Sequence, residues 1–392
     1  MKVRRILSLF VLGLRRIVAR PGSAGVVVLG SAGAVAVLCF FMAVSDGLHS
    51  AMLAAGRDDR ALVLRRGSDS ELNSLMTLQV RDLLVSEQGT AGGAEQWFSR
   101  ELVRVINLPD TDSGKIVAYP IRGVGDQFQQ VRPEVRIVEG RMFNPGNHEF
   151  IVGQGIVRAM PALRVGEELP IKGVRWRIVG IFSSGGSTHD SEIFADRETL
   201  RSFYQATHIS SVTVRVESPA ALTALQQRIE ADRQHRLQVI SEADYYNALA
   251  TRSSAPLKVV TALVGTLMAI AAVFAAMNAI HVSVSSRSRE LKTLSAIGFD
   301  SNSIVMAQLL EAVLLCLVGA CLGALLTWSM LGGSSISLVV GAARLNQTSF
   351  DLQVTAEAVV YCMLIGVLVG IAAGLPPAIR SVRMSAAAIR HT

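Results

Sequence analysis

Four long apolar stretches limit what this chain can fold into. In their interiors, the first, second and fourth stretches contain no charged residue, and the third contains only Glu311. A helix needs about 20 apolar residues to cross the hydrocarbon core of a membrane. The sequence therefore predicts four transmembrane helices, over residues 23–45, 257–282, 303–331 and 356–379.

The positions of Lys and Arg predict how the chain is oriented. Basic residues lie before the first span, between the second and third spans, and after the fourth: Lys2, Arg4, Arg5, Arg15, Arg16, Arg20, Arg287, Arg289, Lys292, Arg380, Arg383 and Arg390. The short loop of residues 332–355 has only Arg344. Because short loops rich in Lys and Arg stay in the cytoplasm, we expect both termini to be cytoplasmic and residues 46–256 to lie outside.

Three further segments flank the spans on the cytoplasmic side. Residues 1–22 place apolar residues and arginines on opposite sides at helical spacing, which predicts a retained amphipathic helix in the membrane interface. It is expected to be either a simple anchor or an elbow that moves with the transporter. Residues 283–302 contain Leu291, Leu294 and Ile297 at helical spacing among basic residues, which predicts a short amphipathic helix that ends near Gly298. Residues 380–392 form a tail.

The first span is rich in Gly, Ala and Ser. Small residues let two helices approach closely in a membrane. This span is therefore expected to pack closely on a neighbouring span of the same chain or on a second copy of the protein.

The outer segment, residues 46–256, has the pattern of a mixed α/β domain. Strands are predicted at 61–64, 115–122, 134–138, 149–152, 175–182, 210–216 and 237–240, with a helix at 219–233 and another from Ser241. The strands at 134–138 and 149–152 are expected to form a hairpin. Two groups of strands with intervening helices suggest two lobes. The predicted fold is an α+β membrane protein, with this domain inserted between the first and second transmembrane helices.

Composition argues against several classes of function. The net charge of +7 comes largely from basic residues beside the spans, which is not the pattern of a nucleic-acid-binding face. Gly114-Lys115 lacks the glycine and Ser/Thr of a phosphate-binding loop. The run Ser183–Asp190 contains Ser, His and Asp, but they are neighbours on one glycine-rich segment, which is not the geometry of a catalytic triad. A loop without catalytic function is the favoured interpretation. The four cysteines all lie in predicted spans. Neither they nor the histidines have the spacing of metal ligands.

Three motifs around the second and third spans resemble the signature of MacB/FtsX-type permeases of ATP-binding-cassette transporters. They are Val284–Leu291, Leu294–Gly298 and Glu311–Leu315. In the outer segment, Glu139–Phe143, Glu149–Gly153 and Val165–Phe182 are similar to the MacB-like periplasmic core domain of that family. The resemblance extends over nearly the whole chain and is weakest over residues 65–115.

Because the sequence has no phosphate-binding loop, we expect a permease without ATPase activity or cofactor of its own. The resemblance implies that it lies in a bacterial inner membrane. A separate ATPase subunit would bind ATP and receive a coupling helix in a groove. The candidate ATPase-coupling residues are Arg287, Arg289, Glu290, Leu291, Leu294, Gly298 and Phe299. A simpler interpretation is that these charges only fix topology and that the apolar residues pack on the chain's own spans. Further expected partners are a second permease copy, membrane lipids, a periplasmic adaptor and an outer-membrane protein.

Glu311 and Asn278 are polar residues within predicted spans. A carboxylate at the centre of a span costs roughly 3 kcal/mol, so Glu311 is expected to face other helices and to pair with Asn278 or His281. A structural polar clamp is favoured over a proton relay because no second membrane acid accompanies it. Since the spans are otherwise almost wholly apolar, they are expected to convey force from the ATPase to the outer domain, as in the mechanotransmission of the family.

Three functions stay open beside export or efflux. One is extraction of lipids or lipoproteins from the membrane. Another is FtsX-like regulation of a periplasmic cell-wall hydrolase without transport. The third, a membrane-anchored periplasmic enzyme, would not need a coupling helix.

Overall fold

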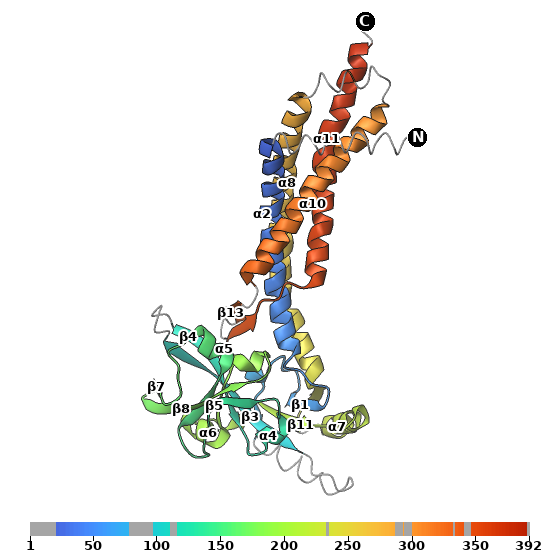
Figure 1. Cartoon of the computed structure of the whole chain (residues 1–392). Helices are drawn as coiled ribbons and strands as arrows, with labels where there is room; N and C mark the ends of the chain where they lie inside the picture. The colour runs from blue at the N-terminus through green and yellow to red at the C-terminus, as the bar shows by residue number, and fades with distance from the viewer. Residues whose placement is uncertain are drawn as a thin grey trace. The chain divides into compact units, whose positions relative to one another are not determined.

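The computed structural model describes residues 21–77, 97–109, 116–232, 235–286, 293, 300–331, 334–340 and 346–389. The chain divides into two compact units. The helical unit comprises residues 1–46, 256–334 and 352–392, and the sheet unit comprises residues 47–255 and 335–351. Each is described by itself below (Figure 1).

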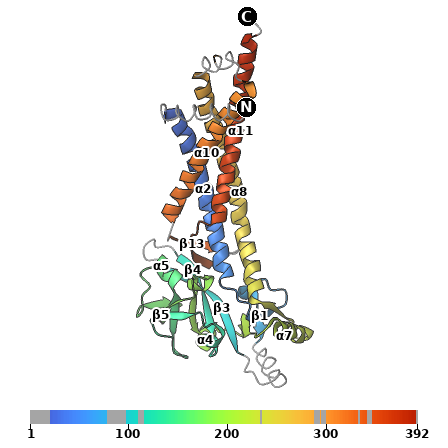
Figure 2. The ribbon, with the colours of Figure 1, turned by 45° about the vertical axis from the view of Figure 1, so that its right-hand side comes forward.

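Four long helices provide the helical unit: α2 (Pro21–Leu53), α8 (Glu242–Ser286), α10 (Ser301–Leu331) and α11 (Ala356–Ile389). Each contains a segment long and apolar enough to cross a membrane: Ala24–Leu53, Glu242–Val282, Asn302–Leu331 and Ala356–Arg380. Within the helical unit these helices run alongside one another in both views (Figures 1 and 2). They coincide with the four predicted spans, although α2 and α8 extend well past their predicted outer ends into the sheet unit.

Glycines hold α10 close to two of its neighbours. A Cβ atom on Gly319 of α10 would lie 2.6 Å from the carbonyl oxygen of Val28 on α2. A Cβ on Gly370 of α11 would lie 2.7 Å from Val313 Cα on α10. Thr327 Oγ1 also donates a hydrogen bond to the Ala36 carbonyl on α2, at 3.2 Å. The small residues of the first span therefore pack on a helix of the same chain, one of the two arrangements expected from the sequence.

One ten-stranded sheet forms the framework of the sheet unit. Its order is β12-β1-β11-β3-β4-β9-β6-β8-β5, and β7 pairs with β8. The strands are β1 (Arg60–Arg65), β3 (Phe98–Pro109), β4 (Ile116–Val124), β5 (Arg136–Gly140), β6 (Glu149–Gly153), β7 (Glu168–Ile171), β8 (Val174–Ser183), β9 (Ile193–Asp196), β11 (Ser211–Arg215) and β12 (Leu237–Ser241). The short strands β2 (Met76–Thr77) and β10 (His208–Ile209) pair separately.

Short helices connect these strands. They are the 3-10 turns η1 (Glu71–Asn73) and η2 (Thr188–Ser191), and the helices α4 (Phe128–Val131), α5 (Gln154–Ala159), α6 (Arg197–Tyr204) and α7 (Pro219–Ala231). The two longest begin with side-chain caps: Asp196 accepts from Thr199 N at α6, and Ser218 accepts from Ala221 N at α7. Each cap satisfies a backbone donor that the first helical turn leaves unpaired.

The predicted hairpin between residues 134–138 and 149–152 is wrong. β5 pairs with β8, whereas β6 lies between β8 and β9. After Gly140, whose φ is +79°, the Arg141 N–H donates to the Val179 carbonyl at 2.9 Å. The segment after β5, residues 141–148, therefore leads the chain across β8 to β6 instead of folding it back on β5.

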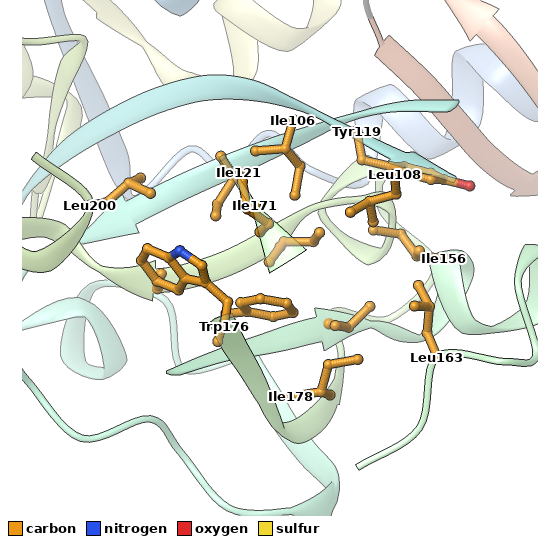
Figure 3. Packing of buried hydrophobic residues seen from close by; sticks show 14 of the residues in the cluster. Ile106, Leu108, Tyr119, Ile121, Ile156, Leu163, Ile171, Trp176, Ile178 and Leu200 are labelled. Carbon is orange, nitrogen blue, oxygen red and sulfur yellow. The ribbon is translucent and has the colours of Figure 1, made fainter. Parts of the chain in front are cut away.

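Two apolar clusters occupy different parts of this sheet. The larger surrounds Trp176 of β8, with Ile121, Ile156 and Leu200 among its buried members (Figure 3). The second comprises residues of β1, β11, β12 and α7, including Val214 and Leu225. β3 belongs to both regions, because its first residues pair with β11 and its later residues pair with β4. The division into two lobes stays a prediction.

The segment between the third and fourth spans contributes a hairpin to the sheet unit. β13 (Ser335–Val340) and β14 (Asn346–Asp351) pair in antiparallel register. β14 lies against β4, η2 and α5. Phe350 is 3% exposed, and Asp351 Oδ1 accepts from Arg158 Nη1 of α5 at 3.0 Å. Residues 332–355, expected to be a simple loop, thus include a structural part of the other unit.

Candidate functional site

The predicted ATPase-coupling residues lie outside the described residues. These are Arg287, Arg289, Glu290, Leu291, Leu294, Gly298 and Phe299. Their assignment stays a prediction.

The two intramembrane polar residues lie on different helices of the helical unit. Glu311 of α10 is half-buried. Asn278 and His281 of α8 are exposed. The pairing of Glu311 with either of them therefore stays a prediction.

An apolar groove runs between α2, α8 and α11 within the helical unit. Its volume is about 730 Å³. Leu38, Ala269, Phe274 and Leu368 are among its apolar lining residues. Polar groups are restricted to a few positions: Ser45, Asp46, Lys258, Thr261, Thr266 and Tyr361. The groove is therefore chemically suited to apolar chains that carry a polar end.

The first turn of α8 is built into the sheet unit. Tyr245 and Tyr246 are buried in an apolar cluster with Ala55, Leu62 and Leu64. A Cβ atom on Gly56, which follows α2, would lie 2.9 Å from Ala243 Cα. The segments that end α2 and begin α8 therefore pack closely on β1.

A network of buried charged side chains lies beneath this first turn. Three arginines face four glutamates, and all seven residues are at most 7% exposed: Arg60, Arg122, Arg132, Glu71, Glu101, Glu192 and Glu242. They come from β1, η1, β3, β4, the end of α4, the end of η2 and the first residue of α8. We call this set the buried charge network.

Arg122 is the most completely paired member of the network. Its guanidinium donates to Glu192 through Nε and Nη2, at 2.7 and 3.1 Å. It donates to Glu71 through Nη1 and Nη2, at 2.8 and 3.0 Å, and to Glu101 through Nη1 at 2.6 Å. The planar guanidinium suits such paired contacts with carboxylates. Arg122 therefore joins η1, β3 and the end of η2 at one point.

Glu242 is held by two other arginines. Its Oε1 lies 2.7 Å from Arg132 Nη1, and its Oε2 lies 2.7 Å from Arg60 Nε. Both are close ion pairs, although neither has the alignment of a hydrogen bond. Arg60 also bonds Glu134 at 2.7 Å, and Arg132 Nε lies 3.5 Å from Glu101. Through Glu101, the first residue of α8 is connected to Arg122.

His189 of η2 completes this arrangement. Its Nδ1 lies 3.1 Å from Glu192 Oε1, and its Nε2 lies 3.2 Å from Arg132 Nη1. Because a guanidinium can only donate, Nε2 acts as the acceptor, and Nδ1 carries the proton that is donated to Glu192. His189 is fully buried, and its ring nitrogens contact Glu192, Arg132 and the Tyr246 hydroxyl. Asp190 accepts from the backbone of Ser184 and Gly186.

The pKa values of Glu101, Glu192, Arg122 and Arg132 are shifted in the direction that keeps these side chains charged. Burial alone would raise the pKa of Glu101 and Glu192, but the neighbouring positive groups lower both pKa values overall. The pKa of Glu101 is lowered by the charges of Arg132 and Arg122, and the pKa of Glu192 is lowered most strongly by the charge of Arg122. Burial would lower the pKa of Arg122 and Arg132, and the surrounding glutamates raise both above the usual range.

Sequence reasoning missed this network. Arg122 is separated from its three glutamates by 21, 51 and 70 residues, so no local motif marks the pairs. One signal was present: Arg122 is the one charged residue of the otherwise mostly apolar strand β4. A charged residue at a buried strand position requires a partner.

Comparison with known proteins places the chain in a family. Residues 24–232 match the MacB-like periplasmic core domain, and residues 262–386 match the FtsX-like permease C-terminal region. The macrolide export ATP-binding/permease protein MacB of Bordetella avium (strain 197N) is 26% identical over 292 residues, 67% of this chain and 42% of that protein. MacB 1 of Aeromonas hydrophila subsp. hydrophila is 26% identical over 282 residues, with the same two coverages.

The chain thus spans 42% of the length of these two relatives. Among solved structures, the periplasmic region of MacB from Actinobacillus actinomycetemcomitans aligns with a TM-score of 0.38 at 13% identity. That alignment covers 48% of this chain and 92% of the other. The family matches confirm the resemblance found in the sequence, and the four apolar helices are those of a multi-pass membrane protein. The chain belongs to the family of FtsX-like permeases of ATP-binding-cassette transporters that carry a MacB-like periplasmic core domain.

Proposed function

We propose that this permease converts ATP hydrolysis by a separate ATPase subunit into movement of its sheet unit. The observation that carries the proposal is the continuity of α2 and α8. Each is a single helix whose residues belong partly to the helical unit and partly to the sheet unit. A helix transmits displacement along its axis because its backbone hydrogen bonds make it stiff, although Pro256 removes one of these bonds from α8.

The movement would drive export from the periplasm or from the outer leaflet of the inner membrane. Both termini and residues 283–302 would lie in the cytoplasm, where the ATPase binds, and the sheet unit would lie in the periplasm. Two permease copies would act with two ATPase copies, together with a periplasmic adaptor and an outer-membrane protein. The spans favour force transmission over a polar channel, because their interiors contain almost no charged residues.

Copurification with a coexpressed ATPase subunit tests this proposal. The full chain is extracted in detergent as wild type, Arg289→Glu and Leu294→Asp, and bound ATPase and its turnover are measured. We expect both variants to lose the ATPase, since one reverses a charge and the other places a charge among apolar residues. Arg175→Glu is the matched control, because Arg175 is 82% exposed on β8 of the sheet unit.

Two results would contradict the proposal. One is a wild-type protein that recruits no ATPase. The other is binding by Arg289→Glu and Leu294→Asp that equals binding by the wild type and Arg175→Glu.

The groove between α2, α8 and α11 favours a second candidate, the extraction of lipids or lipoproteins. Its lining is mostly apolar, and Asp46 and Lys258 provide charges of both signs. An acyl chain with a polar head group matches that chemistry. Copurified lipids, identified by mass spectrometry, should decrease in Ala269→Trp, which fills the groove, and should not change in Met330→Trp, an exposed position on α10.

A further inference from the structure

We infer that Glu242 is the positioning residue that anchors α8 on the sheet, and that the buried charge network transmits movement of α8 to β1, β3 and β4. The transmission rests on the proposed function, whereas the anchoring does not. Glu242 is the first residue of α8 and is fully buried.

The attachment of α8 through Glu242 is strong because the charges that form it are shielded from solvent. Arg60, Arg132 and Glu242 are each at most 1% exposed. A buried charge that loses its partner is strongly destabilising, since the protein interior solvates it poorly. Displacement of Glu242 from its position would leave two arginines short of a counter-charge. The start of α8 is therefore held to the sheet much more firmly than an exposed ion pair would hold it.

The same side chains connect α8 to several strands at once. Arg60 is part of β1, and Arg132 lies at the end of α4, where Arg132 Nη2 also donates to Thr213 of β11 at 3.3 Å. Arg132 approaches Glu101 of β3, which is bonded to Arg122 of β4. A displacement of Glu242 consequently changes the electrostatic environment of four consecutive strands of the sheet, β1, β11, β3 and β4.

The two kinds of contact in the network suit different tasks. Arg122 makes aligned hydrogen bonds that fix the directions of Glu71, Glu101 and Glu192. Glu242 makes close contacts without that alignment. Charge attraction depends mainly on distance, so Glu242 is held by charge more than by directed hydrogen bonds. The network thereby joins a directionally fixed centre at Arg122 to an electrostatic attachment at the start of α8.

Hydrogen exchange of the full chain in lipid nanodiscs tests the anchor without ATP or a partner. We expect Glu242→Gln to make the amides of residues 243–250 exchange about tenfold faster or more, because a broken buried pair favours local opening. Asp244→Asn is the matched control: it removes a carboxylate from the same helical turn, but Asp244 is exposed. It should leave exchange near the wild-type rate and thereby exclude an effect of the helix dipole.

Two further variants separate the anchor from a general loss of folding. Glu242→Asp retains the charge and should recover much of the protection. Glu242→Gln combined with Arg132→Gln removes one charge of each sign. The double variant should lose less protection from exchange than the sum of the losses in the two single variants. Exchange in β8 should stay at the wild-type rate in each variant. Unchanged protection of residues 243–250 in Glu242→Gln, or equal loss in Asp244→Asn, would overturn the anchor.

The transmission is tested in complex with the coexpressed ATPase subunit. Trapping with ADP and vanadate should alter exchange in β1 and β3 of the wild type, and Glu242→Gln should abolish that change. A nucleotide effect that persists in Glu242→Gln would overturn the transmission. A wild type without any nucleotide effect would contradict the proposed function, while the anchor would still be decided by the measurements without nucleotide.

Discussion

Arg122 Nη1 lies 2.6 Å from Glu101 Oε2 in the interior of the sheet unit, and both side chains are at most 2% exposed. The same guanidinium bonds Glu71 and Glu192, so one cation bridges carboxylates from three segments of the chain. Such a centre stabilises the fold only while it is complete.

Replacing Arg122 by methionine should strongly destabilise the sheet unit. The change leaves three buried glutamates without their main counter-charge, and breaking buried pairs of this kind costs about 3–5 kcal/mol. Thermal unfolding of the detergent-solubilised protein measures the effect. Arg175→Met serves as control, since Arg175 is 82% exposed and surface changes stay within about 0.5 kcal/mol. Equal melting temperatures for the two variants would contradict the assigned role of Arg122.

Acid should weaken the sheet unit through Glu101 and Glu192. Their pKa values are lower in the folded protein than in the unfolded chain, where a glutamate has a pKa of about 4.3. Below that pH the unfolded chain binds more protons, so stability is fully present above it and is lost as pH falls further. The denaturant concentration at the midpoint of unfolding, measured between pH 3 and pH 6, should therefore fall as the pH is lowered.

Glu192→Gln provides the control for this pH dependence. The variant should be less stable at neutral pH and should lose less stability on acidification, because one of the titrating groups is gone. An acid dependence identical to that of the wild type would show that other carboxylates determine it.

Gly370→Ala should separate α10 from α11. The added Cβ would lie 2.7 Å from Val313 Cα, and a backbone atom cannot move aside as a side chain can. Overpacking of this kind costs about 1–3 kcal/mol. Heating in detergent followed by size-exclusion chromatography measures the folded fraction. Gly33→Ala, with no atom within 4 Å of the added Cβ, should be neutral or slightly stabilising. Similar losses in both variants would count against this packing.

Oxidation should join Cys39 of α2 to Cys362 of α11. Their Sγ atoms lie 3.2 Å apart, and both residues are buried in the helical unit. Treatment with copper phenanthroline, which enters membranes, should yield a linked peptide pair detectable by mass spectrometry. Cys39→Ser should abolish the link, and the exposed Cys321 should not replace Cys39 in it. If the main product joins Cys321 to Cys362, the described contact between α2 and α11 is incorrect.

The four membrane helices could be predicted from the sequence because each satisfies a local requirement, namely length without charge. A helix from Ser241 was also expected, but composition alone does not show that it is continuous with the second span. Its first turns contain Tyr245, Tyr246 and Asn247, which do not form a membrane span by composition. The helix continues there because the two tyrosines are buried on the sheet, which is a tertiary effect.

Strand pairing and the buried charge network depend on contacts between distant residues. The local pattern located strands at β1, β4, β6, β8, β11 and β12 but assigned β5 to the wrong neighbour and missed β3 and β9. β3 carries Arg100, Glu101 and Arg104 among its apolar residues, and such charges ordinarily argue against a buried strand. Glu101 is tolerated because Arg122 and Arg132 neutralise it, information that no window of sequence contains.

The hairpin of β13 and β14 has a consequence for work on soluble fragments. A fragment of residues 47–255 would omit β14 and uncover the surface on β4, η2 and α5 that Phe350 and its neighbours occupy. Exposed apolar surface of that kind promotes self-association. The soluble portion of this permease is thus encoded in two separate parts of the gene, and a faithful fragment needs residues 335–351 rejoined through a linker.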